Sequence, residues 1–314
     1  MSGNARTSRK PKVLGHGSQL AVFAPASPAD NVKLSAGMAE LKRLGFEAKS
    51  YPAMVSREYF AGPTEERRDG FLQAITARDV DGLIGLRGGY GSNYLLDDLA
   101  KELGEPKVVI GFSDLTSLQI YLWQKSGWVS VHGPMVAAGL AAGAGVPGGY
   151  DEESFLAAVG KKDGGWTVCL KGESLVGGES EGTLLGGCLT LVETTLGTPW
   201  ELDTRGAILI LEDRGMKPWQ VDRALMHLKQ AGKLSGVRGM VLGEFPECEP
   251  PVAGSPTVRD VCARILGPLG VPIVFAAPVG HTPRAMLTIP LGVKARLISK
   301  GEGKLEILEP AVVA

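Results

Sequence analysis

Short apolar runs alternate with longer amphipathic segments through the first half of the chain. The run Leu20–Ala24 precedes Ala29–Leu44, where apolar residues recur at helical spacing and Gly45 follows in the position of a C-terminal cap. Further strands are predicted at 46–51, 80–86, 107–112 and 128–131, and further helices at 64–78, 93–103 and 116–123. This alternation predicts an α/β layer with a mainly parallel sheet.

The alternation becomes irregular beyond a stretch rich in alanine, glycine and proline, Ala137–Gly149, which is predicted to be a linker. Strands are then predicted at 166–170, 181–185, 207–212, 239–243, 273–275 and 295–298, and helices at 152–159, 188–196, 218–230 and 257–266. The expected fold class is therefore α/β with two domains. A disordered lead over residues 1–18 precedes an N-terminal α/β domain over 19–145, and a mixed, β-rich domain covers 151–314.

Composition and charge narrow the range of partners. The chain of 314 residues has 33 basic and 34 acidic residues, so no net field favours nucleic acid or an anionic membrane. The cysteines are Cys169, Cys188, Cys248 and Cys262, which are far apart and lack the spacing of a zinc site. They are expected to be free thiols in a reducing compartment, with no metal bound.

The N-terminal segment shares some features with a secretion signal. Basic residues up to Lys12 precede the apolar run Leu20–Ala26. The run is short, however, and Pro25 interrupts it, so a first buried strand is the favoured interpretation. A cytoplasmic protein is expected on this basis, and no run in the sequence is long enough to span a bilayer.

The predicted strand 107–112 ends in the turn Gly111-Phe112-Ser113-Asp114, and a predicted helix follows directly. A serine in this position can cap the helix, because its oxygen accepts bonds from unpaired N–H groups. It can also be a nucleophile lifted out of the sheet beside a helix N-terminus, although the turn is not a G-x-S-x-G motif. The turn by itself leaves both interpretations open.

A nucleophilic serine needs a base, and the chain has four histidines. His16 lies in the presumed lead, and His227 is predicted on the polar side of a helix. His132 follows a predicted strand, where a structural role is the main alternative. His281 stands between glycine and a turn proline in a loop, where the backbone can hold a base.

Two other stretches carry candidate chemistry. Glu212 ends the apolar strand 207–212 and is a candidate to orient the base, with Asp213 as its competitor and an ion pair with Arg214 as the simpler alternative. The loop Arg87-Gly88-Gly89-Tyr90-Gly91 lacks the lysine of a P-loop. Its paired glycines can instead bring N–H groups to a developing oxyanion.

Eight short motifs follow one another along the chain. They are Leu86-Arg87-Gly88-Gly89-Tyr90-Gly91, Ile110-Gly111-Phe112-Ser113-Asp114, His132-Gly133-Pro134-Met135, Leu185-Gly186-Gly187, Leu196-Gly197-Thr198-Pro199, Leu211-Glu212-Asp213, Val221-Asp222-Arg223 and Gly280-His281. With this set in this order, the chain resembles the LD-carboxypeptidase family of serine peptidases, the muramoyltetrapeptide carboxypeptidases. The resemblance extends from about Leu20 to the C-terminus.

The resemblance implies a catalytic triad of Ser113 as nucleophile, Glu212 as orienting acid and His281 as base, at a site between the two domains. The implied reaction removes the terminal D-alanine from muramoyl-tetrapeptide in peptidoglycan recycling, through an acyl-enzyme. The implied substrate is thus a small murein peptide, cofactors are not required, and a homodimer is expected.

Further site residues follow from this interpretation. The backbone N–H of Asp114, at the helix start, is the expected oxyanion donor, with Gly88 or Gly89 as its partner. Arg87 is a candidate to hold the free carboxylate of D-alanine. Cys188 stands where many relatives have asparagine, and it is therefore expected near the substrate.

Two alternatives remain open. The same superfamily contains microcin-immunity-type peptidases, which cleave peptidyl and aminoacyl adenylates and carry a longer loop with a base-stacking aromatic. The short interval from Phe245 to Pro251 favours the peptidoglycan enzyme. A non-catalytic two-domain binding protein is the other alternative, and the three triad candidates argue against it.

Overall fold

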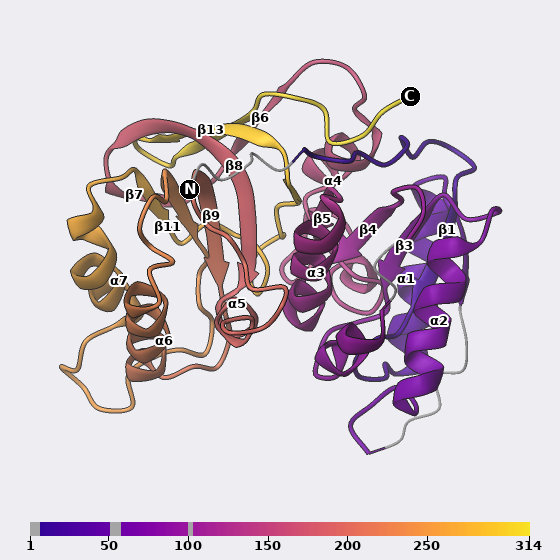
Figure 1. Cartoon of the computed structure of the whole chain (residues 1–314), viewed down its shortest axis with the longest axis horizontal. Helices are drawn as coiled ribbons and strands as arrows, with labels where there is room; N and C mark the ends of the chain where they lie inside the picture. The colour runs from indigo at the N-terminus through magenta and orange to yellow at the C-terminus, as the bar shows by residue number, and fades with distance from the viewer. Residues whose placement is uncertain (1–6, 51–57, 100–102) are drawn as a thin grey trace.

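Five parallel strands form most of the first sheet in the computed structural model of the chain, which describes residues 7–50, 58–99 and 103–314 (Figure 1). The strand order is β12-β5-β4-β3-β1-β2, with β12 antiparallel to β5. The strands are β1 Gln19–Phe23, β2 Glu47–Ser50, β3 Gly82–Gly85, β4 Val108–Gly111, β5 Ser130–His132 and β12 Ile289–Leu291. The helices on this sheet are α1 Asn31–Arg43, α2 Thr64–Thr76, α3 Thr116–Ser126 and α4 Glu152–Gly160.

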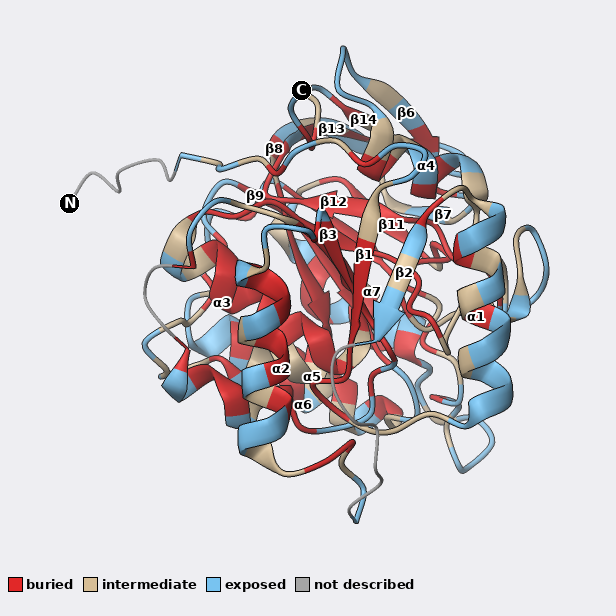
Figure 2. Ribbon diagram, turned by 90° about the vertical axis from the view of Figure 1, so that its right-hand side faces the viewer, coloured by how far each residue is buried: buried red, intermediate tan, exposed pale blue. Residues whose placement is uncertain are grey.

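Both faces of the first sheet are covered by helices. Alternate residues of β1 enter different core clusters, with Leu20 and Val22 packing on the side of α1 and α4, and Ala21 and Phe23 on the side of α2 and α3. The period of two in a strand explains this division. Figure 2 shows the central strands in the buried interior and the edge strand β2 largely exposed.

The second sheet has the order β6-β14-β13-β8-β9-β10-β11-β7. The run β8 to β11 is parallel, and the flanking strands are antiparallel. Its strands are β6 Trp166–Cys169, β7 Glu173–Val176, β8 Gly178–Cys188, β9 Ala207–Glu212, β10 Gly239–Leu242, β11 Ile273–Phe275, β13 Lys294–Ser299 and β14 Lys304–Ile307, and its helices are α5 Leu189–Thr194, α6 Pro218–Gln230 and α7 Val258–Leu266. The expected fold class, a mainly parallel N-terminal sheet and a mixed, β-rich C-terminal sheet, is confirmed.

The two sheets share a hydrophobic cluster. One face of β9 packs with α6 and α7, while Ile208 and Ile210 on the other face belong to the same cluster as Val129 and Ile289 of the first sheet. In Figure 1 the two halves meet around α3 and α5, which are in contact. This shared core fixes the position of one sheet relative to the other.

The boundary expected near residue 150 differs from the observed division of the core. Helix α4 packs on the first sheet through Phe155, and β12 joins that sheet as its edge strand. The strand β12 was not predicted because it is three residues long and contains Pro290, which is tolerated at a sheet edge. The first sheet therefore includes elements from both sides of the predicted linker.

The structure differs from the predictions in three further elements, η1, β7 and β14. The predicted helix 93–103 is a 3-10 helix, η1 Ser92–Asp98, and residues 100–102 of it lie outside the described range. Strands β7 and β14 were not predicted, because both are only four residues long and neither forms a continuous apolar run. Residue 51, at the end of a predicted strand, also lies outside the described range.

The expected disordered lead is not observed from residue 7 onward. Arg9 N donates to Gly127 O at 2.7 Å, and Leu14 N donates to Val159 O at 2.9 Å. The side chain of Leu14 is only 3% exposed in the core beneath α4. Apolar residues within this basic segment thus attach it to the first domain, while residues 1–6 lie outside the described range. None of the helices in the described ranges is long and apolar enough to cross a membrane.

The Gly186-Gly187 pair lets β8 approach its neighbours closely. A Cβ atom on Gly186 would lie 2.0 Å from Ile210 O, and one on Gly187 would lie 2.6 Å from Thr116 Oγ1. Both residues have positive φ, 121° and 136°. The motif therefore serves the contact of β8 with β9 and with α3.

We predict that Gly186→Ala lowers the free energy of unfolding by about 3 kcal/mol, because the new methyl group overlaps a backbone carbonyl and the positive φ adds strain. Gly206→Ala is the matched control, since its φ is 73° and nothing lies within 4 Å of the added Cβ. The control should lose only about 1 kcal/mol. Urea denaturation measures the free energy of unfolding of both variants, and equal losses of this free energy would contradict the steric explanation.

Candidate active site

Ser113 stands at a strained corner between β4 and α3. Its φ is +60°, in the left-handed region that non-glycine residues rarely adopt. The N-cap of α3 is Leu115, and neither α3 nor the 3-10 turn η2 Ser113–Leu115 has a side-chain cap bond. The helix-cap interpretation therefore fails, and Ser113 instead holds a strained backbone conformation at a strand-to-helix turn.

Gly88 packs directly against this corner. A Cβ atom on Gly88 would lie 2.8 Å from Ser113 Oγ and 3.4 Å from Asp114 N. Gly89 turns toward Ser27 instead, since its Cβ would lie 2.2 Å from Ser27 Oγ. The glycine loop and the serine turn, separate in the sequence, thus meet at the carboxyl ends of β3 and β4.

Asp114 fixes the turn through its buried side chain. Its carboxylate accepts a bond from Ser92 N at 2.8 Å and is only 2% exposed. Burial raises the pKa of Asp114, and the bonds from Ser92 and the nearby charge of Arg67 oppose the rise. The side chain is engaged with the glycine loop, while its backbone N–H remains at the helix start.

The second sheet contributes a carboxylate paired with a histidine. Glu212, at the end of β9, is fully buried, and its Oε2 lies 2.7 Å from His281 Nδ1. His281 N also donates to the same oxygen at 2.8 Å. Gly280 makes this approach possible, because its φ is +62° and an added Cβ would lie 2.2 Å from Glu212 Cδ. Backbone and ring together orient the imidazole.

The competing acid has a different role. Asp213 Oδ2 accepts bonds from Thr190 N at 2.9 Å and from Thr190 Oγ1 at 2.7 Å, and so it anchors the start of α5. The guanidinium of Arg214 pairs with Glu247. Asp213 is therefore not the partner of His281, and the Arg214 guanidinium pairs with Glu247 and not with Glu212.

Burial and the Glu212–His281 hydrogen bond shift the pKa of each of these two residues in opposite directions. Burial raises the pKa of Glu212, but the charge and hydrogen bonds of His281 outweigh it, so the pKa lies below the ordinary 4.5. Burial lowers the pKa of His281, and the Glu212 charge and hydrogen bond outweigh it, so the pKa lies above 6.5. The pair favours a carboxylate that stabilises an imidazolium.

Phe112 and His132 join this pair to the first sheet. The Phe112 ring, next to Ser113, lies edge-on to His281 with 5.1 Å between ring centroids. His132 is fully buried with Nε2 4.0 Å from Glu212 Oε1. Burial lowers the pKa of His132, and the nearby charge of Glu212 opposes the change. The elements that carry the serine and the histidine are therefore in contact.

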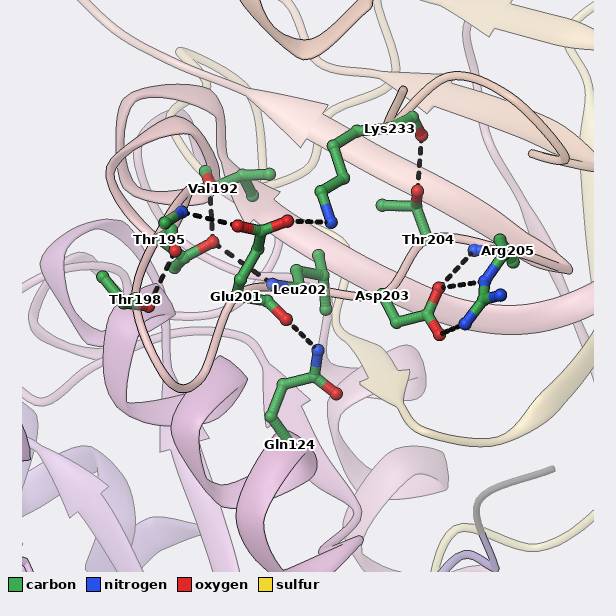
Figure 3. A network of polar contacts seen from close by, with 11 residues as sticks. Gln124, Val192, Thr195, Thr198, Glu201, Leu202, Asp203, Thr204, Arg205 and Lys233 are labelled. Atoms are coloured by element: carbon green, nitrogen blue, oxygen red, sulfur yellow. Dashed lines mark hydrogen bonds and ion pairs between the residues drawn. The ribbon is translucent and has the colours of Figure 1, made fainter. Parts of the chain in front are cut away.

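Helix α3 is also fixed at its far end. Gln124 Nε2 donates to Glu201 O, and the Glu201 carboxylate accepts from Gly197 N at 2.5 Å and pairs with Lys233 (Figure 3). The Leu196-Gly197-Thr198-Pro199 motif thus forms part of a loop that holds α3 against the second domain. This loop positions the helix that begins behind Ser113.

A cavity of about 310 Å³ adjoins His281. It is lined by Phe112, Ala138, Gly139, Gly148, Gly149, Arg214, Pro246, Glu247, Gly280, His281, Thr282, Pro283 and Met286. The predicted linker therefore contributes to its wall, and so does the pair Arg214–Glu247, which the sequence did not single out for binding. No local motif marks that pair, because its two residues meet only in the folded chain.

Two predicted substrate residues lie outside this lining. Arg87 is exposed, and its Nη1 donates to Pro28 O at 3.2 Å. Cys188 is 3% exposed and pairs across strands with Glu212. Its backbone N donates to Thr116 Oγ1 at 3.1 Å, and burial, with the charges of Glu212 and Asp213, raises the pKa of its thiol. Cys188 thus lies behind the site and links β8 to α3.

In the described parts of the chain, no group of three or more His, Cys, Asp or Glu side chains is arranged to hold a metal ion.

The Glu212–His281 contact predicts a specific titration. In NMR spectra the His281 ring should titrate above pH 6.5, and Glu212→Gln should lower its pKa, because the main charge that opposes the effect of burial is then removed. Glu306→Gln is the control, since it removes a carboxylate from an ion pair with Arg296 on another part of the second sheet. An unchanged His281 titration in Glu212→Gln would contradict the observed pairing.

Comparison with known proteins places these features in a family. Residues 20–133 match the LD-carboxypeptidase N-terminal domain, and residues 181–297 match the LD-carboxypeptidase C-terminal domain. A probable murein peptide carboxypeptidase of Bacillus subtilis is 32% identical over 95% of this chain and 94% of its own.

Solved structures agree with this assignment. The muramoyltetrapeptide carboxypeptidase of Oxalobacter formigenes matches with a TM-score of 0.81 and 30% identity, covering 93% of this chain and 99% of its own. The microcin C7 self-immunity protein MccF matches with a TM-score of 0.87 over 96% of this chain and 99% of its own, and at 23% identity it shows the shared fold. The chain belongs to the LD-carboxypeptidase family of serine peptidases and is a hydrolase of that family.

Proposed function

We propose that the protein is an L,D-carboxypeptidase that releases the terminal D-alanine from muramoyl-tetrapeptide in peptidoglycan recycling. The murein peptide and muramoyltetrapeptide carboxypeptidases among its relatives support this substrate class. The observation that carries the proposal is the pair of hydrogen bonds from His281 to the buried Glu212 carboxylate. The His281 ring also packs against Phe112, the residue before the strained Ser113. A histidine held by a buried carboxylate is the base that a serine nucleophile requires.

In the proposed mechanism Ser113 Oγ attacks the carbonyl carbon of the third residue, and its proton passes to His281. The C–N bond to D-alanine breaks as His281 returns the proton to the departing amine. Water, deprotonated by His281, then hydrolyses the acyl-Ser113 ester. Glu212 stabilises the imidazolium that forms in each half of the cycle.

The oxyanion is proposed to accept bonds from the N–H of Asp114 and from the glycine loop. The contact of Gly88 with Ser113 supports Gly88 ahead of Gly89 as the second donor. Arg87, on the same loop, is the proposed ligand of the D-alanine carboxylate. Cys188 is not proposed to contact the substrate, because it is buried on β8, paired with Glu212 of the neighbouring strand.

The proposal includes a cytoplasmic location and a homodimer. The free state of all four cysteines supports a reducing compartment. The homodimer follows from the family resemblance alone, and light scattering of the purified protein tests it.

The first test is D-alanine release from UDP-muramoyl-tetrapeptide. Ser113→Ala and His281→Ala should each lower kcat/KM by at least about 10⁴-fold while the circular dichroism stays unchanged, and Glu212→Gln by about 10³- to 10⁴-fold. In the wild-type enzyme the acidic limb of the pH profile should lie above pH 6.5, because only neutral His281 accepts the serine proton. Cleavage of an aminoacyl adenylate without D-alanine release would assign the enzyme to the microcin-immunity type instead.

A second test concerns the turn at Ser113. Gly88→Ala should lower kcat/KM by about 10²-fold, because the new methyl group displaces Ser113 Oγ, and small misplacements of a reacting group have effects of this size. The φ of Gly88 is not in the left-handed region, so the fold should tolerate alanine there. Gly15→Ala, with nothing within 4 Å of its Cβ, is the control. Full activity of Gly88→Ala would remove the glycine loop from the proposed site.

A further inference from the structure

The cavity beside His281 carries two opposite charges that the proposed chemistry does not use. Arg214 Nε donates to Glu247 Oε2 at 3.0 Å, and Arg214 Nη2 donates to Oε1 at 2.5 Å. Both side chains line the cavity, and each is more than half exposed, at 56% and 61%. An exposed ion pair adds little to stability, so its position at the cavity calls for another explanation.

Glu247 lies in a loop with a strained backbone conformation. Phe245 and Glu247 both have positive φ, 51° and 62°, although neither is glycine. Phe245 is 5% exposed and stacks on Phe275, with 6.5 Å between ring centroids, and Gly215 N donates to Pro246 O at 3.0 Å. Strained positions of this kind concentrate at ligand sites. The loop therefore presents Glu247, already aligned with Arg214, to the cavity.

The pair also lies close enough to His281 to interact with it electrostatically. The pKa of Glu247 is lowered first by its hydrogen bond from Arg214, and the His281 charge adds to the effect. A group bound by the pair would thus be near the base.

The charges of the pair select among possible ligands. A lone carboxylate at Arg214 would be repelled by Glu247, and a lone ammonium at Glu247 would be repelled by Arg214. A group that carries both charges on one carbon meets both residues favourably. Since Nε and Nη2 of Arg214 face Glu247, Nη1 is left to bind an incoming carboxylate.

We propose that Arg214 and Glu247 form a subsite for a zwitterionic amino-acid group at the end of the substrate's side chain, as in a diaminopimelate third residue. The inference rests on the proposed function. It adds that the subsite recognises the side-chain carboxylate that diaminopimelate has and lysine lacks. The volume of the cavity, about 310 Å³, is in the range of small-ligand sites.

Binding to the inactive Ser113→Ala protein tests the subsite. Three tetrapeptides serve as probes: one with meso-diaminopimelate at the third position, one with its side-chain carboxylate amidated, and one with L-lysine. Calorimetry should show the first binding roughly tenfold tighter than the others, as expected for charge-assisted hydrogen bonds. Adding Arg214→Gln or Glu247→Gln should remove this preference. Adding Arg205→Gln, which breaks an exposed bidentate pair with Asp203 away from the cavity (Figure 3), should preserve it.

Each other result overturns the inference. An equal loss for all three peptides in Arg214→Gln would mean that Arg214 holds the D-alanine carboxylate, which they share. An unchanged preference in both variants, or no binding of any peptide to the Ser113→Ala protein, would also refute the subsite. Turnover by the wild-type enzyme tests the proposed function separately, because an Arg214-dependent preference without D-alanine release would refute the function and leave the subsite standing.

Discussion

The buried carboxylate of Glu212 is the constraint on which the site depends. Removing a charged carboxylate from water is costly unless donors surround it, and here Oε2 receives both His281 N and His281 Nδ1. Its other oxygen faces His132 across 4.0 Å. Gly280 leaves the space that the carboxylate occupies, and Gly243 leaves space for the Cβ of Glu212, since an added Cβ on either glycine would overlap these atoms. The charge that stabilises the base is thus held by backbone geometry as well as by a side chain.

This carboxylate also depends on the way the two sheets dock. Glu212 belongs to β9 of the second sheet, whereas Ser113 follows β4 of the first. The hydrophobic cluster that includes Ile210, Val129 and Ile289 spans both sheets, and β12, which follows the His281 loop, pairs with β5. The chain therefore returns to the first sheet immediately after His281. That return keeps the His281 loop beside the first sheet, where the Phe112 ring lies edge-on to His281.

Strain is concentrated around the same region. Ser113 and Glu247 have positive φ; Ser113 follows Phe112 and Glu247 itself lines the cavity, while Phe245, also with positive φ, lies two residues before Glu247. Such conformations persist only where the surrounding packing fixes them. At Ser113 the buried Asp114 carboxylate and the Gly88 contact do so, and at Glu247 the buried Phe245 does. The site is therefore assembled in advance by the core beneath it.

Local sequence patterns determined the α/β class, most of the strands and helices, and the set of candidate residues. Apolar periodicity reports which face of an element is buried, and it needs no knowledge of neighbours. The same patterns did not predict β12, because this short edge strand contains Pro290. They also did not predict that residues 7–18 pack on the first domain through apolar residues such as Leu14. They also left Ser113 undecided between a helix cap and a nucleophile. The tertiary structure shows the edge strand, the packing of residues 7–18 and the lack of a capping bond from Ser113. The Glu212–His281 contact and the Arg214–Glu247 pair join residues that are far apart in the sequence. Their distances depend on the order of the strands in the second sheet, and that order is a long-range property of the chain.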